Sequence, residues 1–431
     1  MSHSDHKELR PLGEFWLADN PLEKLHGYLD LSEEYPCLRL IGGFGIGRLL
    51  LDDVVIHGCF RLHKPTKVTL FNCFGSTVSH SSLTQSGQYQ SQLAETTATS
   101  TLAVFGGYFD NYSDFNGIGI EFRLPHVASW FHHDCFETNT DFETRTVTIQ
   151  YSYYEEHPFQ LSDELSLELI YSGSIIAGGW GMENLQLERP LRLFLKARKL
   201  SNYEELRTQA HWYRCLFSWL MDKPLPLHEL CFVRSNTDSE PGYQRHPVIE
   251  NSRPIEVGEY SFSDCLLEYP HIKNFFPTLL MGWSRLIDEQ SDSLASFFGV
   301  FLNPTIGDEH EFLAVAAACE QLNFRTEGKQ SDMKVWLSAL AKRWQHIAEP
   351  IADELIDQIT NTRHYYAHRT HKRSQKAARG FLLIRYTYFL QALYSLELLC
   401  LLGMPINEID ALVSSNYKLR EKLNRLCFPG S

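Results

Sequence analysis

Residues 361–370, with the sequence NTRHYYAHRT, place an arginine and two histidines in a basic part of an acidic chain. The formal net charge of the 431-residue chain is −14, but residues 358–395 contain no aspartate or glutamate. His364 and His368 are four positions apart, so a helix would present both on one face with Arg363 near its edge. These residue types at this spacing suit chemistry on a phosphate group.

The reaction that such a cluster favours is metal-free cleavage of RNA. A base removes the proton of a ribose 2′-OH, that oxygen attacks the adjacent phosphate, and an acid protonates the leaving 5′ oxygen. Histidine can act as base or acid near neutral pH, and the guanidinium of Arg363 matches two phosphoryl oxygens as charge develops. One histidine cannot play both parts at once, so two copies of the cluster across a two-fold axis would be needed.

A structural explanation of the same residues stays open at this stage. If the helix that begins near Ile351 continues, Arg363 extends the apolar stripe of Ile356 and Ile359, and it then needs a carboxylate, a phosphate or water as a partner. An acid such as Glu320 would satisfy it. The histidines would then only cap the helix end, where positive charge is favourable.

Composition limits the class of protein. A hydrophobic content of 43% excludes global disorder, and 431 residues suit two domains. The ten cysteines are scattered without a CxxC pair, and His57, Cys59, His63 and Cys73 lack a zinc-like spacing. We therefore expect a cytoplasmic protein without a metal or another cofactor.

The first part of the chain predicts strands. Apolar and polar residues alternate in LSLELIY (165–171), in LRLFLKARKL (191–200) and in TVTIQYSYYEE (146–156), where Val147 and Ile149 would share the buried face. This pattern predicts an antiparallel, sandwich-like β-rich domain over residues 1–274, with one helix at about 202–221. Residues 76–101 are polar and low in charge, which fits an exposed loop or Thr-rich edge strands that contact a partner.

From about residue 275 the apolar period changes to 3.6 residues, which predicts an all-α bundle over residues 275–431 and gives an α+β protein as a whole. The most apolar segment, residues 381–403, is interrupted by Arg385, Gln391 and Glu397. These residues would be costly within a bilayer, so we predict a buried core helix and no membrane span.

The order Arg363-His364-x-x-x-His368 resembles the signature of HEPN ribonucleases, in which an arginine and a polar residue precede the catalytic histidine. The helix FLAVAAACEQL, which ends near Glu320, and the long helix after Gly380 also resemble the surroundings of that motif. A β-rich domain followed by a HEPN bundle is similar to the ApeA-type abortive-infection proteins of bacterial phage defence. This resemblance covers nearly the whole chain.

The resemblance implies a homodimeric, metal-independent endoribonuclease that cuts host or phage RNA, with tRNA as one candidate substrate. Arg363 would contact the scissile phosphate, His368 would be the acid or base, and His364 would position or assist. Glu320 and Asn361 would support this group from behind. The β-rich domain would sense a phage-encoded trigger or restrain the nuclease.

Further residues are candidates for RNA contact through charge or stacking. They are Arg369, Lys372, Arg373, Tyr365 and Tyr366. The basic residues could instead belong to a solvated loop, and the tyrosines to the bundle core. A function of another class also stays open: a dimer that holds RNA or a partner without cutting it, while its β-rich domain recognises a phage or host ligand.

Overall fold

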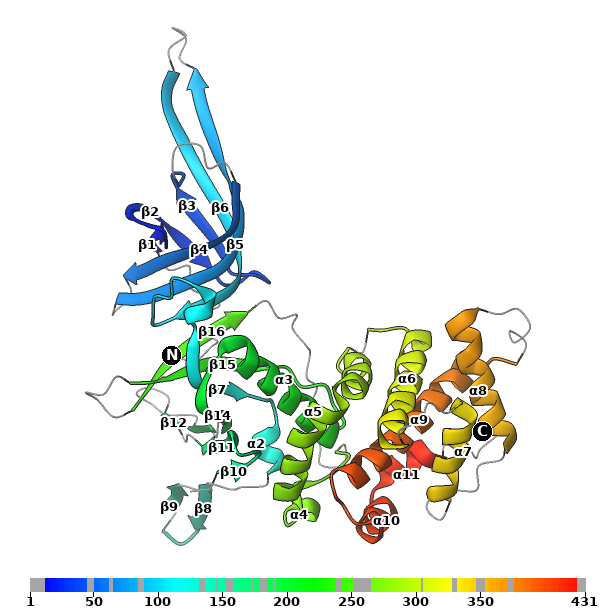
Figure 1. The fold of residues 1–431 in the computed structure, drawn as a ribbon. Helices are drawn as coiled ribbons and strands as arrows, with labels where there is room; N and C mark the ends of the chain where they lie inside the picture. Colours follow the sequence, from blue (N-terminus) through cyan, green and yellow to red (C-terminus); the bar gives the residue numbers. More distant parts are fainter. Residues whose placement is uncertain are drawn as a thin grey trace.

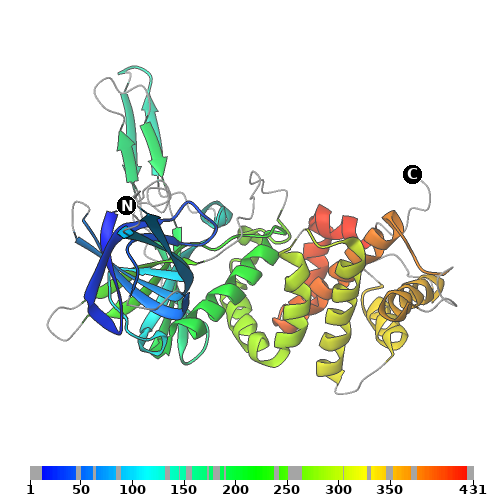
Figure 2. The same ribbon diagram turned by 90° about the horizontal axis from the view of Figure 1, so that it is seen from above.

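The structure is a computed structural model, and Figure 1 shows its fold. It describes residues 12–44, 50–61, 65–83, 89–131, 136–144, 146–151, 158–171, 174–177, 185–188, 191–236, 242–250, 265–303, 305–327, 332–345, 353–369 and 376–424. From the N-terminus onward, the described chain passes through a β-barrel, a second antiparallel sheet and a region of helices (Figures 1 and 2).

The barrel is a closed antiparallel ring in which β4 pairs with β5 to join the two ends of the strand order β5-β6-β3-β2-β1-β4. Alternation along the strands fills its interior, for example with Phe15, Leu38, Val68 and Leu70, all fully buried. The strands are β1 (Leu12–Leu17), β2 (Asn20–Asp30), β3 (Cys37–Ile41), β4 (Leu50–Arg61), β5 (Pro65–Leu83) and β6 (Tyr89–Phe105).

Strand β6 leads from the barrel into the second sheet. One of its edges pairs with β5, and its other edge pairs first with β3 and then with β16, where Val104 lies opposite Val248. The order continues as β16-β15-β7-β14-β11-β10, again antiparallel. These strands are β7 (Asn116–Arg123), β10 (Phe159–Gln160), β11 (Leu165–Tyr171), β14 (Leu191–Asn202), β15 (His228–Ser235) and β16 (Tyr243–Glu250).

Helix α3 (Tyr203–Leu220) packs on β7 and β14 and connects the second sheet to the helical region. A capping box fixes its start, because the side chain of Asn202 accepts from the backbone of Glu205 and the side chain of Glu205 accepts from the backbone of Asn202. At its other end, Trp219 Nε1 donates to Ser395 Oγ at 3.1 Å. The apolar residues of the second sheet, α3 and the later helices form one continuous core.

The helical region is built around α9, which is buried along most of its length and contacts α6, α10 and α11. Helix α5 bends at Gln290, whose backbone is not helical (φ −130°, ψ 21°). The helices are α4 (Tyr269–Ile272), α5 (Phe276–Phe301), α6 (Asp308–Glu327), α7 (Met333–Arg343), α8 (Asp353–His368), α9 (Phe381–Leu401), α10 (Ile406–Ser415) and α11 (Tyr417–Asn424).

Shorter elements complete the described chain. The hairpins β8 (Phe136–Asp141) with β9 (Thr146–Tyr151), and β12 (Ser174–Ala177) with β13 (Leu185–Glu188), are separate two-stranded sheets. A 3₁₀ turn (Tyr112–Asp114) and helix α2 (Val127–Trp130) connect parts of the second sheet. The far ends of β5 and β6 extend beyond the barrel as a polar hairpin, in agreement with the strand alternative for residues 76–101 (Figure 1).

The predicted α+β class is confirmed, as are the helix at about 202–221 and the buried core helix after Gly380. The N-terminal sheet closes into a barrel, whereas the sequence indicated a sandwich-like arrangement, because the β4–β5 pairing removes the open edges. The sequence predicted that Val147 lies on a buried face, and this prediction is wrong. Its side chain is 62% exposed, because it belongs to the separate hairpin β8–β9.

Two other predictions concern the division of the chain and membranes. The domain boundary predicted between residues 274 and 275 falls just before α5, which begins at Phe276. It stays a prediction, because one continuous hydrophobic core contains residues from both sides of it. Within the residues described above, no helix is long and apolar enough to cross a membrane.

Candidate functional site

The arginine and histidines of the predicted site lie in the last two turns of α8, at the end of the molecule away from the barrel (Figures 1 and 2). Asp353 and Glu354 occupy the first turn of α8, where the helix dipole stabilises negatively charged side chains. Ile356 and Ile359 are buried, and α8 packs against α6 and α7. This packing fixes which side of α8 faces outward.

Arg363 forms an ion pair with a carboxylate of α6. Its Nη2 lies 2.8 Å from Glu320 Oε2, and the two side chains are 25% and 26% exposed. The ion pair between Arg363 and Glu320 that the structural explanation required is therefore present. The supporting role of Glu320 in a catalytic group stays a prediction. One carboxylate does not use all five donors of a guanidinium, so an approaching phosphate can share this arginine.

His364 and His368 lie one helical turn apart, with ring centroids 6.1 Å from each other and an angle of 26° between their planes. His364 is half-buried and His368 is exposed. The spacing read from the sequence thus produces two neighbouring imidazoles on one face, beside Arg363.

Arg369 follows the last residue of α8 in the left-handed backbone region, with φ +49°. Its Nη2 lies 2.6 Å from Glu309 Oε2 on α6, and this hydrogen bond raises the pKa of Arg369. The guanidinium also lies over the rings of Tyr365 and Tyr366, at 5.8 and 5.3 Å from their centroids. The candidate RNA-binding arginine is thus already engaged within its own chain.

The two tyrosines differ in exposure. Tyr366 is 6% exposed, burial raises its pKa, and its hydroxyl donates to the carbonyl of Ala378 at 3.0 Å. Its ring therefore belongs to the core, as the alternative reading of the tyrosines proposed. Tyr365 is half-buried, and the guanidinium of Arg379 lies 5.8 Å from its ring centroid. Of the two rings, Tyr365 is the better placed to meet a base.

The remaining predicted residues fall into two groups. Asn361 lies on α8 and is half-buried. Lys372 and Arg373 lie outside the described residues.

We name the surface formed by Arg363, His364, Tyr365, His368 and Arg369 the α8 patch.

Besides the hydrogen bond from Tyr366 to Ala378, two further hydrogen bonds hold α8 to the chain that follows it. Thr362 Oγ1 accepts from the backbone N–H of Ala378 at 3.0 Å, and Tyr386 OH donates to Gln358 Oε1 at 2.7 Å. They fix the start of α9 beside the patch, where Phe381 and Leu382 are 67% and 42% exposed. A basic surface beside exposed apolar side chains can take part in contact with another molecule.

Sequence reasoning missed the role of Glu309. The segment around the α8 patch has no acid in sequence, yet α6 brings Glu309 and Glu320 to its arginines in space. Both acids come from more than 40 positions earlier, so no local pattern could reveal these pairs. The patch is less basic than its sequence indicates.

Comparison with known protein families assigns a family to residues 12–283, about two thirds of the chain. The sequence model described as ApeA N-terminal domain 1 matches residues 12–283. The chain belongs to the ApeA N-terminal domain family. No curated protein and no solved structure matches it.

The ApeA N-terminal domain spans the barrel, the second sheet, α3 and α4, and it ends within α5. It thus includes every described strand of the fold and helix α3, which connects the second sheet to the later helices. The α8 patch lies beyond the matched residues, so its chemistry is inferred from its own geometry.

Proposed function

We propose that this ApeA-type protein acts in bacterial defence against phage as a metal-independent endoribonuclease. The observation that carries the proposal is the pair of imidazoles, His364 and His368, one turn apart beside the guanidinium of Arg363. The ApeA N-terminal domain supports the defence context. The helices that follow it would form a HEPN-type bundle.

In this proposal, Arg363 binds the scissile phosphate and neutralises the charge that develops on it. His368, the more exposed imidazole, serves as acid or base, and His364 positions the phosphate or assists. Two protomers would bring their α8 patches together, so that one histidine takes the 2′-OH proton while its counterpart protonates the 5′ oxygen. The products are a 2′,3′-cyclic phosphate and a free 5′-OH.

The exposed Phe381 and Leu382 support a contact between protomers at this end of the bundle, because they lie where α9 begins, next to α8. Burial of such side chains is the usual driving force for association. The β-rich part of the chain would then sense a phage-encoded trigger and release or restrain the nuclease. Host or phage RNA, including tRNA, is the proposed substrate.

The test is cleavage of a structured RNA in EDTA by the purified full chain, with and without extract of phage-infected cells. Arg363→Ala and His368→Ala should each lower the rate at least about 100-fold, the scale of a lost general acid or base. Both variants should keep the oligomeric state, measured by light scattering. Arg198→Ala and His271→Ala alter exposed residues of the N-terminal part and serve as matched controls.

Cleavage that persists in both variants would overturn the assignment to the α8 patch. Mass spectrometry of the RNA ends provides a second, independent criterion. Cyclic phosphate ends support attack by the 2′-OH, whereas 5′-phosphate ends would require a different reaction.

A second candidate is a dimer that binds RNA or a partner without cutting it. The observation that favours it is that Arg363 and Arg369 are both paired with acids of α6, which lowers the positive charge available to a transition state. If the wild-type protein never cuts RNA, even with the infected-cell extract, but retains RNA in a filter-binding assay, this binding function replaces the nuclease.

A further inference from the structure

The far ends of β5 and β6 form a two-stranded ribbon that projects from the barrel (Figure 1). Next to the barrel, β5 is also paired with β4, and the last of these pairs joins Ser76 to Leu50. Beyond it, residues 77–83 of β5 are paired with β6 alone among the described strands. Alternate residues of such a strand direct their backbone N–H and C=O groups outward, where another strand can pair with them.

The other edge of the ribbon, that of β6, is partly covered. Strand β6 pairs with β3 as far as Glu95, which lies opposite Ile41. Beyond this pair, the backbone N–H of Gly42 donates to the carbonyl of Ala94 at 2.7 Å, and Thr96 Oγ1 donates to the carbonyl of Gly42 at 2.8 Å. The chain after β3 thus continues along β6. Of the two edges, that of β5 is the more accessible to another strand.

The ribbon lacks the charged residues that usually prevent an open edge from pairing. Residues 68–94 contain no aspartate, glutamate, lysine or arginine, although these residues make up 21% of the chain. Natural edge strands are commonly protected by lysine, by proline or by a short length. Residues 77–83 have no proline either, and the register of β5 with β6 shifts only between Ser81 and Ser82, close to the end of β5. The sequence thus leaves this edge open to pairing.

The hairpin β8–β9 provides a contrast, because it also forms a separate two-stranded sheet. Glu137 and Asp141 belong to β8, and Glu143 follows in the turn. Two copies of such a strand placed side by side would bring like charges together, which costs free energy. The edge of β5 has no such cost when it meets an identical strand. Its composition therefore favours a second copy of the chain as its neighbour.

We propose that the β5 edges of two copies of this chain pair in antiparallel fashion across a two-fold axis, so that the two ribbons form one sheet. A two-fold contact places the same segment of both copies together. When residues 77–83 overlap fully, Ser79 lies opposite Ser81 of the partner subunit. Val78, which is 51% exposed, gains a neighbouring strand. The ribbon and the α8 patch lie at different ends of the molecule, so this contact is separate from the one proposed for the nuclease (Figure 1).

The experiment measures self-association of the purified full chain by sedimentation velocity at concentrations of about 1 to 100 μM. The first variant combines Ser79→Lys with Ser81→Lys, and the second combines Ser79→Glu with Ser81→Glu. Each variant places like charges opposite one another across the axis, so we expect each to self-associate at least about tenfold more weakly than the wild type. A wild type that stays monomeric, or variants that associate as the wild type does, would overturn the proposal.

A mixture of the two variants tests the geometry of the contact. In an equimolar mixture, the lysines of one copy face the glutamates of the other, so association should return at least to the level of the wild type. Damage to the fold of either variant would not be repaired by mixing. If the mixture associates no better than the separate variants, the two β5 edges do not face each other across a two-fold axis, and the proposal fails.

The matched control combines Thr146→Lys with Thr148→Lys. Both residues are exposed, and they lie two positions apart on β9, so the control adds the same charge at the same spacing to the other hairpin. It should associate as the wild type does. An equal loss of association in the control and in the lysine variant of β5 would assign the effect to net charge and overturn the pairing of the β5 edges. None of these measurements depends on cleavage of RNA.

Discussion

Arg363 Nη2 lies 2.8 Å from Glu320 Oε2, so the arginine proposed to bind phosphate already has an acid of the same chain as its partner. Both groups are about three quarters shielded from solvent. An incoming phosphate must share or replace this acid. The pair therefore sets how strongly RNA is held at the α8 patch.

Glu320→Gln should tighten RNA binding. The amide oxygen can still accept from Arg363, but the competing negative charge is gone, and a gain of about 1 kcal/mol corresponds to roughly fivefold in affinity. The measurement is fluorescence anisotropy with labelled RNA in a His368→Ala background, which prevents cleavage. The melting temperature should change little, because partly exposed ion pairs contribute at most about 1 kcal/mol.

Asp357→Asn is the control for this prediction, since it changes the net charge equally near the same helix. Asp357 of α8 pairs with Lys334 at 2.6 Å, and both side chains are about half exposed. Equal gains in affinity for the two variants would mean that only the overall field matters and that Glu320 does not restrain Arg363.

Acid should destabilise the protein through His211 on α3. Burial, together with the charges of Arg214 and Arg207, lowers the pKa of His211 from 6.5 to about 4. The folded chain thus keeps this ring neutral, while the unfolded chain binds a proton below pH 6.5, so the free energy of unfolding falls as the pH drops from 6.5 toward 4. The contribution of this group is at most roughly 3 kcal/mol.

His211→Gln should reduce that fall, as measured by urea unfolding at a series of pH values between 4 and 7. His310→Gln, which alters an exposed histidine of α6, is the matched control and should retain the slope of the wild type. A slope unchanged in His211→Gln would assign the acid sensitivity to other groups.

Glu397→Ala should destabilise the helical region. Glu397 is 9% exposed, its Oε2 lies 2.6 Å from Arg343 Nη1, and its Oε1 accepts from Trp344 Nε1 at 2.8 Å. Truncation leaves the buried indole N–H without this acceptor and removes the charge partner of Arg343. We expect a loss of about 3 kcal/mol in the free energy of unfolding, measured in guanidinium chloride.

The control for Glu397→Ala is Glu289→Ala. Glu289 and Arg285 are 3.8 Å apart on α5, and both are more than half exposed, so the loss should stay below about 0.5 kcal/mol. Similar losses in the two variants would contradict the role assigned to burial.

Two glycine substitutions should have opposite effects on the melting temperature. Gly119 lies in β7, and an added Cβ would come within 2.3 Å of the carbonyl oxygen of Leu195 on β14, so Gly119→Ala should cost about 1–3 kcal/mol. Gly299 lies in α5 with nothing within 4 Å of an added Cβ, so Gly299→Ala should stabilise by about 0.5–1 kcal/mol. Stabilisation by Gly119→Ala would show that the strands can separate freely.

The sequence predicted the helices better than the sheets, for a physical reason. A helix satisfies its backbone locally and needs only one apolar stripe, such as Trp336, Leu337 and Leu340 of α7, all of which are buried. Alternation in a strand indicates two faces but not what covers them, which is why Val147 is exposed. Closure of the barrel depends on the pairing of β4 with β5 and on the strand order around the ring, which no local pattern contains.

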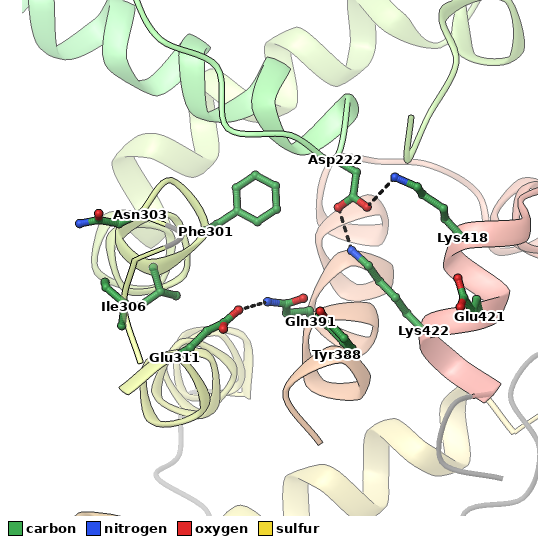
Figure 3. A pocket seen from close by; sticks show the side chains of 11 residues that line it. Asp222, Phe301, Asn303, Ile306, Glu311, Tyr388, Gln391, Lys418, Glu421 and Lys422 are labelled. Atoms are coloured by element: carbon green, nitrogen blue, oxygen red, sulfur yellow. Dashed lines mark hydrogen bonds and ion pairs between the residues drawn. The ribbon is translucent and has the colours of Figure 1, made fainter. Parts of the chain in front are cut away.

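The same distinction holds for the candidate site. The turn that separates His364 from His368 follows from four positions along one helix, so their juxtaposition was predictable. The partner of Arg369 was not, because Glu309 is 60 positions away and reaches it only through the packing of α6 on α8. Likewise, the sequence does not reveal that Lys418 and Lys422 of α11 pair with Asp222, because Asp222 lies about 200 positions earlier, just after α3 (Figure 3).

Strand β6 has a consequence for anyone who wishes to divide this protein into smaller pieces. Its backbone is shared between the ring of the barrel and the neighbour that opens the second sheet. Deleting the barrel together with β6 would remove one of the two strands that pair with β16 and leave that edge of the second sheet open to self-association. Truncations that retain β6 keep that edge paired. The barrel and the second sheet therefore share a strand, and the barrel cannot be removed as a separate domain without exposing the second sheet.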